Sequence, residues 1–168
     1  MFSTWPECWK LPKRKTAMRK DAEELIDAVL DESDCIDDLI DVIREQREAM
    51  RQRDTDSVNS LMDEARNLSF EAQSQEKQRS DIAARFAAKF SCGTNASSLA
   101  SVMADDEKEE FNGAVDKLTQ SVFVLKSEMM ILTGLIDQHE QYTSMLLSEW
   151  RRLNGDIVSQ SGSADFRG

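Results

Sequence analysis

Proline, glycine, cysteine and histidine are all scarce in this chain of 168 residues. Two prolines and six glycines leave few points where a helix must break, and 32% of the residues are charged. This composition is typical of an almost entirely helical protein. The three cysteines, Cys8, Cys35 and Cys92, are odd in number and widely spaced. They give neither a disulfide framework nor a metal-binding pattern, so we expect no metal and no cofactor.

Long apolar runs are absent as well. The longest are the four-residue runs Val122–Leu125 and Met129–Leu132, whereas a membrane-spanning helix needs about 20 apolar residues. The segment Met1–Trp9 lacks the apolar core of a signal peptide. We therefore expect a cytoplasmic protein without stable membrane insertion.

Positive charge is in short supply, with 21 Lys and Arg against 32 Asp and Glu and a net charge of −11. A nucleic-acid partner is not expected, because phosphate contacts need clustered Lys and Arg. Ten acids lie between Asp21 and Ile43 without one Lys or Arg. Paired carboxylates can serve acid–base catalysis or a divalent metal, but no histidine or glycine-rich loop accompanies these. A solvated face is the favoured interpretation, and an enzyme using these acids with His139, the only histidine, is the weakest alternative.

What the chain does have is heptad periodicity. Between Asp105 and Leu153, residues recur at alternating steps of three and four, and all but two are apolar. They are Phe111, Val115, Leu118, Val122, Leu125, Met129, Leu132, Ile136, His139, Thr143, Leu146, Trp150 and Leu153. This is the seam of a coiled coil, and His139 within it is interpreted as a polar seam residue that fixes register or faces a gap.

Two further heptad segments precede this one, near residues 21–52 and 57–90. We expect caps at Asp21 with Glu24, around Asp54, and at Asp105 or Asp106, and a helix stop at Asn154–Gly155. A single short turn is expected at Ser98–Met103. The fold class predicted is all-α: an elongated antiparallel three-helix coiled coil or bundle with a long C-terminal helix. Residues 1–20 form a basic arm and 154–168 a tail, both expected to be flexible, around a helical domain at 21–153.

The third segment carries more apolar residues than one seam requires. Phe123, Met130, Ile131 and Leu135 are the surplus, and they indicate a second apolar surface. Met62 and Met129 are expected to be ordinary core residues. Met130 and Met145 lie off the seam, where flexible sulfur side chains suit a surface that accommodates varied partners.

Three stretches resemble the FlgN family of flagellar type III export chaperones. Leu39–Met50 looks like the end of the family's first helix, Arg53–Leu61 like its short polar turn and second-helix start, and the third heptad segment up to Trp150 like its long last helix. The resemblance covers about Asp21–Leu153.

The resemblance implies a chaperone rather than an enzyme. Its clients would be aggregation-prone terminal helices of the hook–filament junction proteins, handed on to the export apparatus through helix-in-groove contacts. The residues we expect to bind the partner are Met129, Met130, Ile136, Tyr142, Met145, Leu146, Leu147 and Trp150, with Ile157 and Val158 of the tail. The alternative is a structural coiled-coil spacer or oligomerisation module without a client. The sequence leaves open which client is bound and whether the protein is a monomer or a homodimer.

Overall fold

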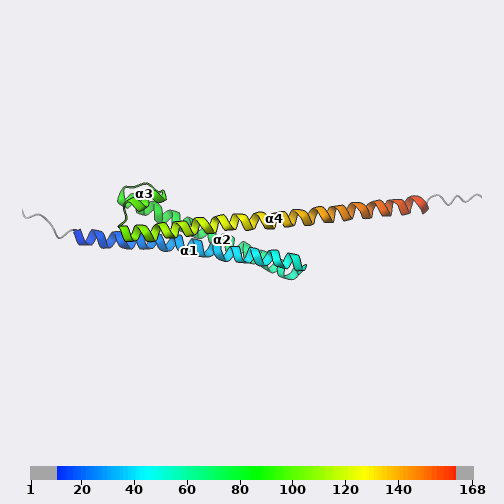
Figure 1. Cartoon of the computed structure of the whole chain (residues 1–168), viewed down its shortest axis with the longest axis horizontal. Helices are drawn as coiled ribbons and strands as arrows, with labels where there is room; N and C mark the ends of the chain where they lie inside the picture. The colour runs from blue at the N-terminus through cyan, green and yellow to red at the C-terminus, as the bar shows by residue number, and fades with distance from the viewer. Residues whose placement is uncertain (1–10, 162–168) are drawn as a thin grey trace, which may run out of the picture. The chain divides into compact units, whose positions relative to one another are not determined.

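A computed structural model describes residues 11–161 of this chain, with side-chain surroundings for residues 18–152. Within that range all regular structure is helical: α1 (Leu11–Gln52), α2 (Thr55–Phe90), the short α3 (Ala96–Ser101) and α4 (Asp105–Ser161) (Figure 1). The all-α prediction is confirmed. The chain divides into two compact units, residues 1–128 and 129–168, and α4 contributes to both.

The turn between α1 and α2 follows the predicted polar sequence. Arg53 has a left-handed φ of 59°, and the backbone N–H of Asp54 donates to the carbonyl of Ala49 at 3.0 Å. The Asp54 carboxylate then accepts from the backbone N–H of Ser57 at 3.1 Å and from its hydroxyl at 2.6 Å. An aspartate that satisfies the free N–H groups of a first turn is a favoured N-cap, so α2 begins directly after it.

The predicted start of the first helix at Asp21 is wrong, because α1 begins at Leu11. Proline is tolerated in a first helical turn, and the Lys, Arg, Ala and Met residues after Pro12 are good helix formers. Asp21 and Glu24 therefore lie inside the helix and form no capping box. They pair instead with Lys89 and Arg85 of α2.

The predicted ends of the last helix also differ from the structure. Glu107, rather than Glu109, reaches back: its carboxylate accepts from the backbone N–H of Ala104 at 3.1 Å. The helix does not stop at Asn154–Gly155 but continues to Ser161, since glycine inside a helix costs only about 1 kcal/mol relative to alanine. The expected flexibility of residues 1–10 and 162–168 lies outside the described residues.

One buried cluster joins all four helices in the first unit. Leu25 from α1, Phe86 from α2, Leu99 from α3 and Phe111 from α4 are each at most 3% exposed and belong to it. The short turn expected at Ser98–Met103 is the helix α3, which contributes Leu99 to this cluster. Burial of these large side chains is the main source of stability for this end of the bundle.

Polar pairs between the helices show the direction of each helix within this unit. Residue numbers fall along α2 as they rise along α1, which makes these two helices antiparallel; the pairs are Asp21–Lys89, Glu24–Arg85 and Glu32–Arg79. Numbers rise together along α1 and α4, as in Asp34–Lys117 and Arg44–Glu128. The chain therefore runs up, down and up, which confirms the helical bundle.

Candidate partner-binding surface

The second unit consists, over its described part, of the α4 residues 129–161. No proline interrupts them. Three hydroxyl side chains bond to carbonyls of the same helix: Thr133 to Met129 at 2.8 Å, Thr143 to His139 at 3.0 Å and Ser148 to Met145 at 2.7 Å. These three hydroxyl donors are therefore satisfied within the helix itself.

Every side chain from Ile136 to Arg152 is exposed. Several of them are large and apolar, with Trp150 64%, Met145 58% and Tyr142 55% exposed. Exposed apolar residues scattered singly are ordinary on a protein surface, but a contiguous group of this kind marks an interaction site. We call the group formed by Met129, Met130, Ile136, Tyr142, Met145, Leu146, Leu147 and Trp150 the apolar stripe.

These eight residues are those the sequence assigned to partner binding, and all eight are exposed. That they contact a partner stays a prediction. The side chains of the other two, Ile157 and Val158, lie outside the described residues, although both positions are within α4.

The seam prediction is wrong for this part of the helix. Leu132 is buried, but Ile136, His139, Thr143, Leu146 and Trp150 are exposed. Periodicity shows that a helix face is apolar, and it does not show which chain covers it. Leu146 and Trp150 are therefore as accessible to a partner as the residues Met145 and Leu147 beside the seam.

Some exposed apolar residues were assigned differently or missed. Met62 and Met129, expected in the core, are 46% and 47% exposed. Phe123 and Ile131 belong to the predicted apolar surplus and are 68% and 47% exposed, while Phe70 was not singled out from the sequence.

Met62 and Phe70 lie in the first half of α2, and no residue of α2 before Ile82 is buried. Gln75 and Arg79 are polar residues at heptad positions that apolar residues occupy elsewhere in α2, and they were the available signal for that loose packing.

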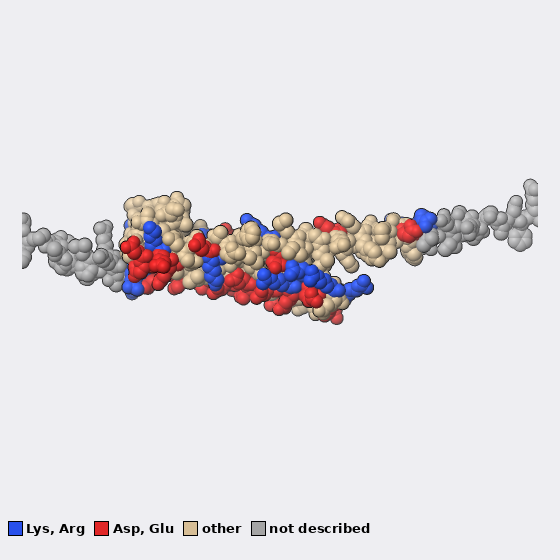
Figure 2. All heavy atoms as spheres, in the orientation of Figure 1, with Lys and Arg blue, Asp and Glu red and all other residues tan. Residues whose placement is uncertain are grey.

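The apolar stripe is nearly free of charge. Between Met129 and Ser148 the chain has two acids, Asp137 and Glu140, and no Lys or Arg. The space-filling view shows mostly uncharged atoms along this length of α4, whereas acidic side chains crowd α1 (Figure 2). A surface of this composition suits apolar contacts better than contacts with a nucleic acid or a charged ligand.

The acids of α1 form an outward face, as predicted. Asp27, Asp31, Asp38 and Asp41 are exposed, at helical spacing. Asp21 and Asp37 are half-buried, and Glu32 is buried: it is 6% exposed and accepts a hydrogen bond from Arg79 of α2. Among the described residues, no group of three His, Cys, Asp or Glu side chains could hold a metal ion.

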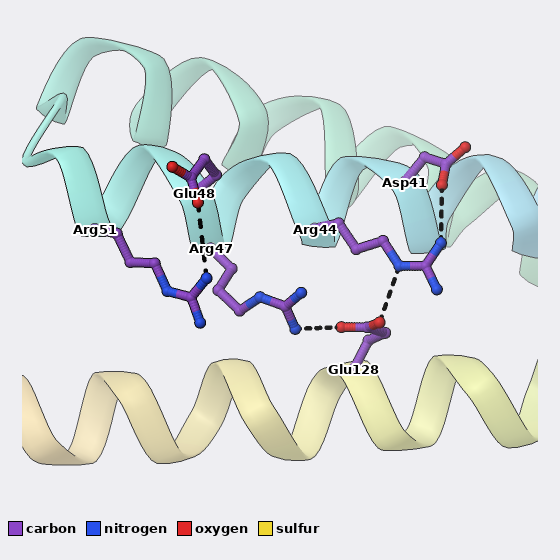
Figure 3. A network of polar contacts seen from close by, with 6 residues as sticks. All are labelled: Asp41, Arg44, Arg47, Glu48, Arg51 and Glu128. Atoms are coloured by element: carbon purple, nitrogen blue, oxygen red, sulfur yellow. Dashed lines mark hydrogen bonds and ion pairs between the residues drawn. The ribbon is translucent and has the colours of Figure 1, made fainter.

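Glu128 joins α4 to α1 at the end of the first unit (Figure 3). Its carboxylate accepts from Arg44 at 2.9 Å and from Arg47 at 2.5 Å, and its side chain is 12% exposed. The hydrogen bond from Arg44 and the positive charges of both arginines lower the pKa of Glu128. Arg44 also pairs with Asp41 at 3.3 Å, so this contact holds the two helices in one register.

Cys35 offers no reactive thiol. It is buried, and burial, together with nearby Glu71, Asp38 and Glu32, raises its pKa. The thiolate is the nucleophilic form of cysteine, so this side chain is a packing residue.

Comparison with known proteins gives one match. The model of the FlgN protein family matches residues 18–159, while no curated protein and no solved structure matches. No helix in the described part of the chain is long and apolar enough to cross a membrane. The matched range includes the bundle and the whole apolar stripe, and the chain belongs to the FlgN family, a family of flagellar export chaperones and not of enzymes.

Proposed function

We propose that this protein is a cytoplasmic chaperone that binds the helical terminal segments of hook–filament junction proteins and delivers them to the flagellar type III export apparatus. The observation that carries the proposal is the apolar stripe, whose residues from Ile136 to Trp150 are exposed and are covered by none of the other residues that the structure describes. An amphipathic helix of a client matches such a surface, because each buries the apolar face of the other.

The apolar stripe has enough exposed side chains to offset the free-energy cost of association. Association costs an estimated 4–15 kcal/mol of translational and rotational freedom, and full burial of one large apolar side chain contributes about 1.5–3 kcal/mol. Several anchors are therefore needed, and the stripe offers eight. Trp150 and Tyr142 are the strongest candidates, because aromatic residues dominate binding hot spots.

The second candidate is a spacer or oligomerisation module. The heptad register of α4 favours it, since a coiled-coil seam can be covered by further copies of the same chain. It predicts a stable homo-oligomer in which Ile136, Leu146 and Trp150 are buried, and no client.

Calorimetric titration tests the proposal. The full chain is titrated with peptides of the N- and C-terminal segments of a hook–filament junction protein from the same cell, and with a peptide from the central part of that protein as the control. We expect binding of the terminal segments alone. Absence of binding, together with a stable homo-oligomer in light scattering, supports the spacer instead.

A further inference from the structure

The packing of α2 changes along its length. Its heptad seam comprises Val58, Leu61, Ala65, Leu68, Ala72, Gln75, Arg79, Ile82 and Phe86. Every seam residue before Ile82 is only half-buried, whereas Ile82 and Phe86 are buried in the cluster that joins the four helices. The large apolar side chains beside the seam, Met62 and Phe70, are 46% and 64% exposed. Residues 55–78, which we call the α2 strap, therefore gain less from apolar burial than the end of the helix does.

The polar contacts of α2 show the same division. The ion pairs between α1 and α2 lie at or beyond Arg79 in the described residues. No side chain of the α2 strap bonds to another helix there, and its one bond from α1 comes from the Cys35 thiol, a weak donor whose Sγ lies 3.7 Å from the carbonyl oxygen of Leu68. On its other side, α1 is bound to α4 along residues 33–47, through Ser33–Ser121, Asp34–Lys117 and Arg47–Glu128. These contacts keep α1 in the bundle even where the α2 strap is not packed against it.

Helix propensity also differs between the two parts of α2. The strap contains six Ser and Asn residues, which are moderate helix formers: Ser57, Asn59, Ser60, Asn67, Ser69 and Ser74. Residues 82–90 contain four alanines, the best helix formers. The turn at Arg53 fixes one end of the strap and the buried cluster fixes the other, so the strap opens by unfolding rather than by swinging out as a rigid helix. An extended residue spans about 3.3 Å against about 1.5 Å in a helix, so the unfolded strap still bridges the two ends.

We infer that the α2 strap is a separate opening unit: it unfolds from α1 and refolds on it while residues 82–90 stay packed. Its opening uncovers Leu39 and Val42 of α1, which follow Cys35 by four and seven residues on the same helix face and are 8% and 7% exposed in the closed form. Segments with few buried contacts open locally at a lower free energy than the whole chain unfolds. This device lies in the first unit and does not depend on the client proposed for α4.

Cys35 is a built-in probe of this opening, because the α2 strap covers its thiol. One chain keeps Cys35 alone, through Cys8→Ser and Cys92→Ser. The matched chain carries Ala28→Cys and has all three native cysteines replaced by serine. Its thiol lies one heptad earlier on the same face of α1, within the buried cluster, and Ala28 and Cys35 are 3% and 7% exposed. Each chain is treated with an aromatic disulfide reagent, and its rate is divided by that of the same chain unfolded in urea, which removes differences in intrinsic thiol reactivity.

We expect the Cys35 thiol to react at least about tenfold faster than the Ala28→Cys thiol on this scale. The Cys35 rate should rise little with low concentrations of urea, because opening of the α2 strap exposes little surface, whereas the Ala28→Cys rate should rise steeply, because it requires unfolding of the buried cluster. A Cys35 rate that is equal to or lower than the Ala28→Cys rate would mean that α2 opens only with the whole bundle, and the inference would be wrong.

Hydrogen exchange of the unmodified chain gives a second measurement, which decides the matter if Ala28→Cys lowers the Tm. We expect the amides of residues 60–78 to exchange at least about tenfold faster than those of residues 82–90. Equal protection of the two parts of α2 would overturn the inference, while the proposed function of α4 would stand.

Discussion

Asp31 and Glu32 are neighbouring acids with opposite surroundings. Asp31 is exposed on the outer face of α1, whereas Glu32 is 6% exposed and pairs with Arg79 of α2. We expect Asp31→Asn to change the free energy of unfolding by no more than about 0.5 kcal/mol. Glu32→Gln should cost about 1–3 kcal/mol, because a buried charged hydrogen bond is weakened. Urea titration followed by circular dichroism measures both, and a large loss for Asp31→Asn would mean that the acidic face has a structural role.

Glu128 should make stability depend on pH. Its pKa is lower in the folded chain, through the bond from Arg44 and the charges of Arg44 and Arg47, so the folded state favours the ionised carboxylate. The stabilisation is complete above the pKa of a free glutamate, about 4.3, and is lost as the pH falls through the lowered folded value. We expect Glu128→Gln to lower the Tm at pH 7 and to match the parent in strong acid. A Tm difference that persists unchanged at pH 2 would show that the ion pairs are not its cause.

At the scale of elements, α4 carries two phenylalanines in opposite environments. Phe111 is 2% exposed in the cluster that joins the four helices, and Phe123 is 68% exposed. Phe111→Ala should cost about 3–5 kcal/mol through lost burial and a cavity, whereas Phe123→Ala on the same helix should cost little. Thermal unfolding measures both. Equal losses would mean that Phe123 is covered in solution, by a second copy or by a rearranged bundle.

Most of the helices and turns could be predicted from the sequence, because residues close to each helix end signal them. Asp54 with Ser57 marks the turn after α1, and the small polar residues after Phe90 mark the end of α2. The helix boundaries that were predicted wrongly have no strong sequence signal. Pro12 does not prevent a helix from starting before it, and Gly155 does not force a helix to stop. Neither residue imposes a backbone conformation that excludes a helix at its position.

The candidate site was predictable in part. The apolar surplus of α4 is visible as composition, so the eight described residues of the stripe could be named from sequence. The sequence could not show which of the seam residues are covered by another helix. Leu118 and Leu146 occupy the same heptad position, yet one is half-buried and the other exposed, because burial depends on whether another helix lies beside that length of α4.

At the scale of the whole molecule, the two units should differ in protection from hydrogen exchange. Residues 136–152 form a helix with exposed side chains throughout, and an isolated helix of this length is marginal in water. We expect their amides to exchange far faster than those of residues 22–43 in α1, whose apolar side chains are all buried except the half-buried Leu30. Client binding should slow the exchange of 136–152. Equal protection in the free protein would indicate that other copies already cover the segment.

The last prediction separates folding from client binding. Met145 and Leu147 are 58% and 48% exposed, so Met145→Glu with Leu147→Glu should leave the Tm and the circular dichroism spectrum close to those of the parent. Binding of the client's terminal segments should fall by at least about two orders of magnitude, because two anchors worth about 1.5–3 kcal/mol each are lost and charge is buried in their place.

The matched control for this double variant is Met62→Glu with Phe70→Glu on α2. These side chains are 46% and 64% exposed and lie outside the apolar stripe, so the control adds the same two charges to equally accessible apolar positions. We expect it to bind the client as the parent does.

Equal weakening of binding by both variants would make the added negative charge the cause, since acids repel a client at a distance in low salt. Unchanged binding by both would place the client surface elsewhere on the chain. A Tm far below that of the parent for the α4 variant alone would mean that Met145 and Leu147 are packed against another copy in solution, and the spacer function would then replace the chaperone.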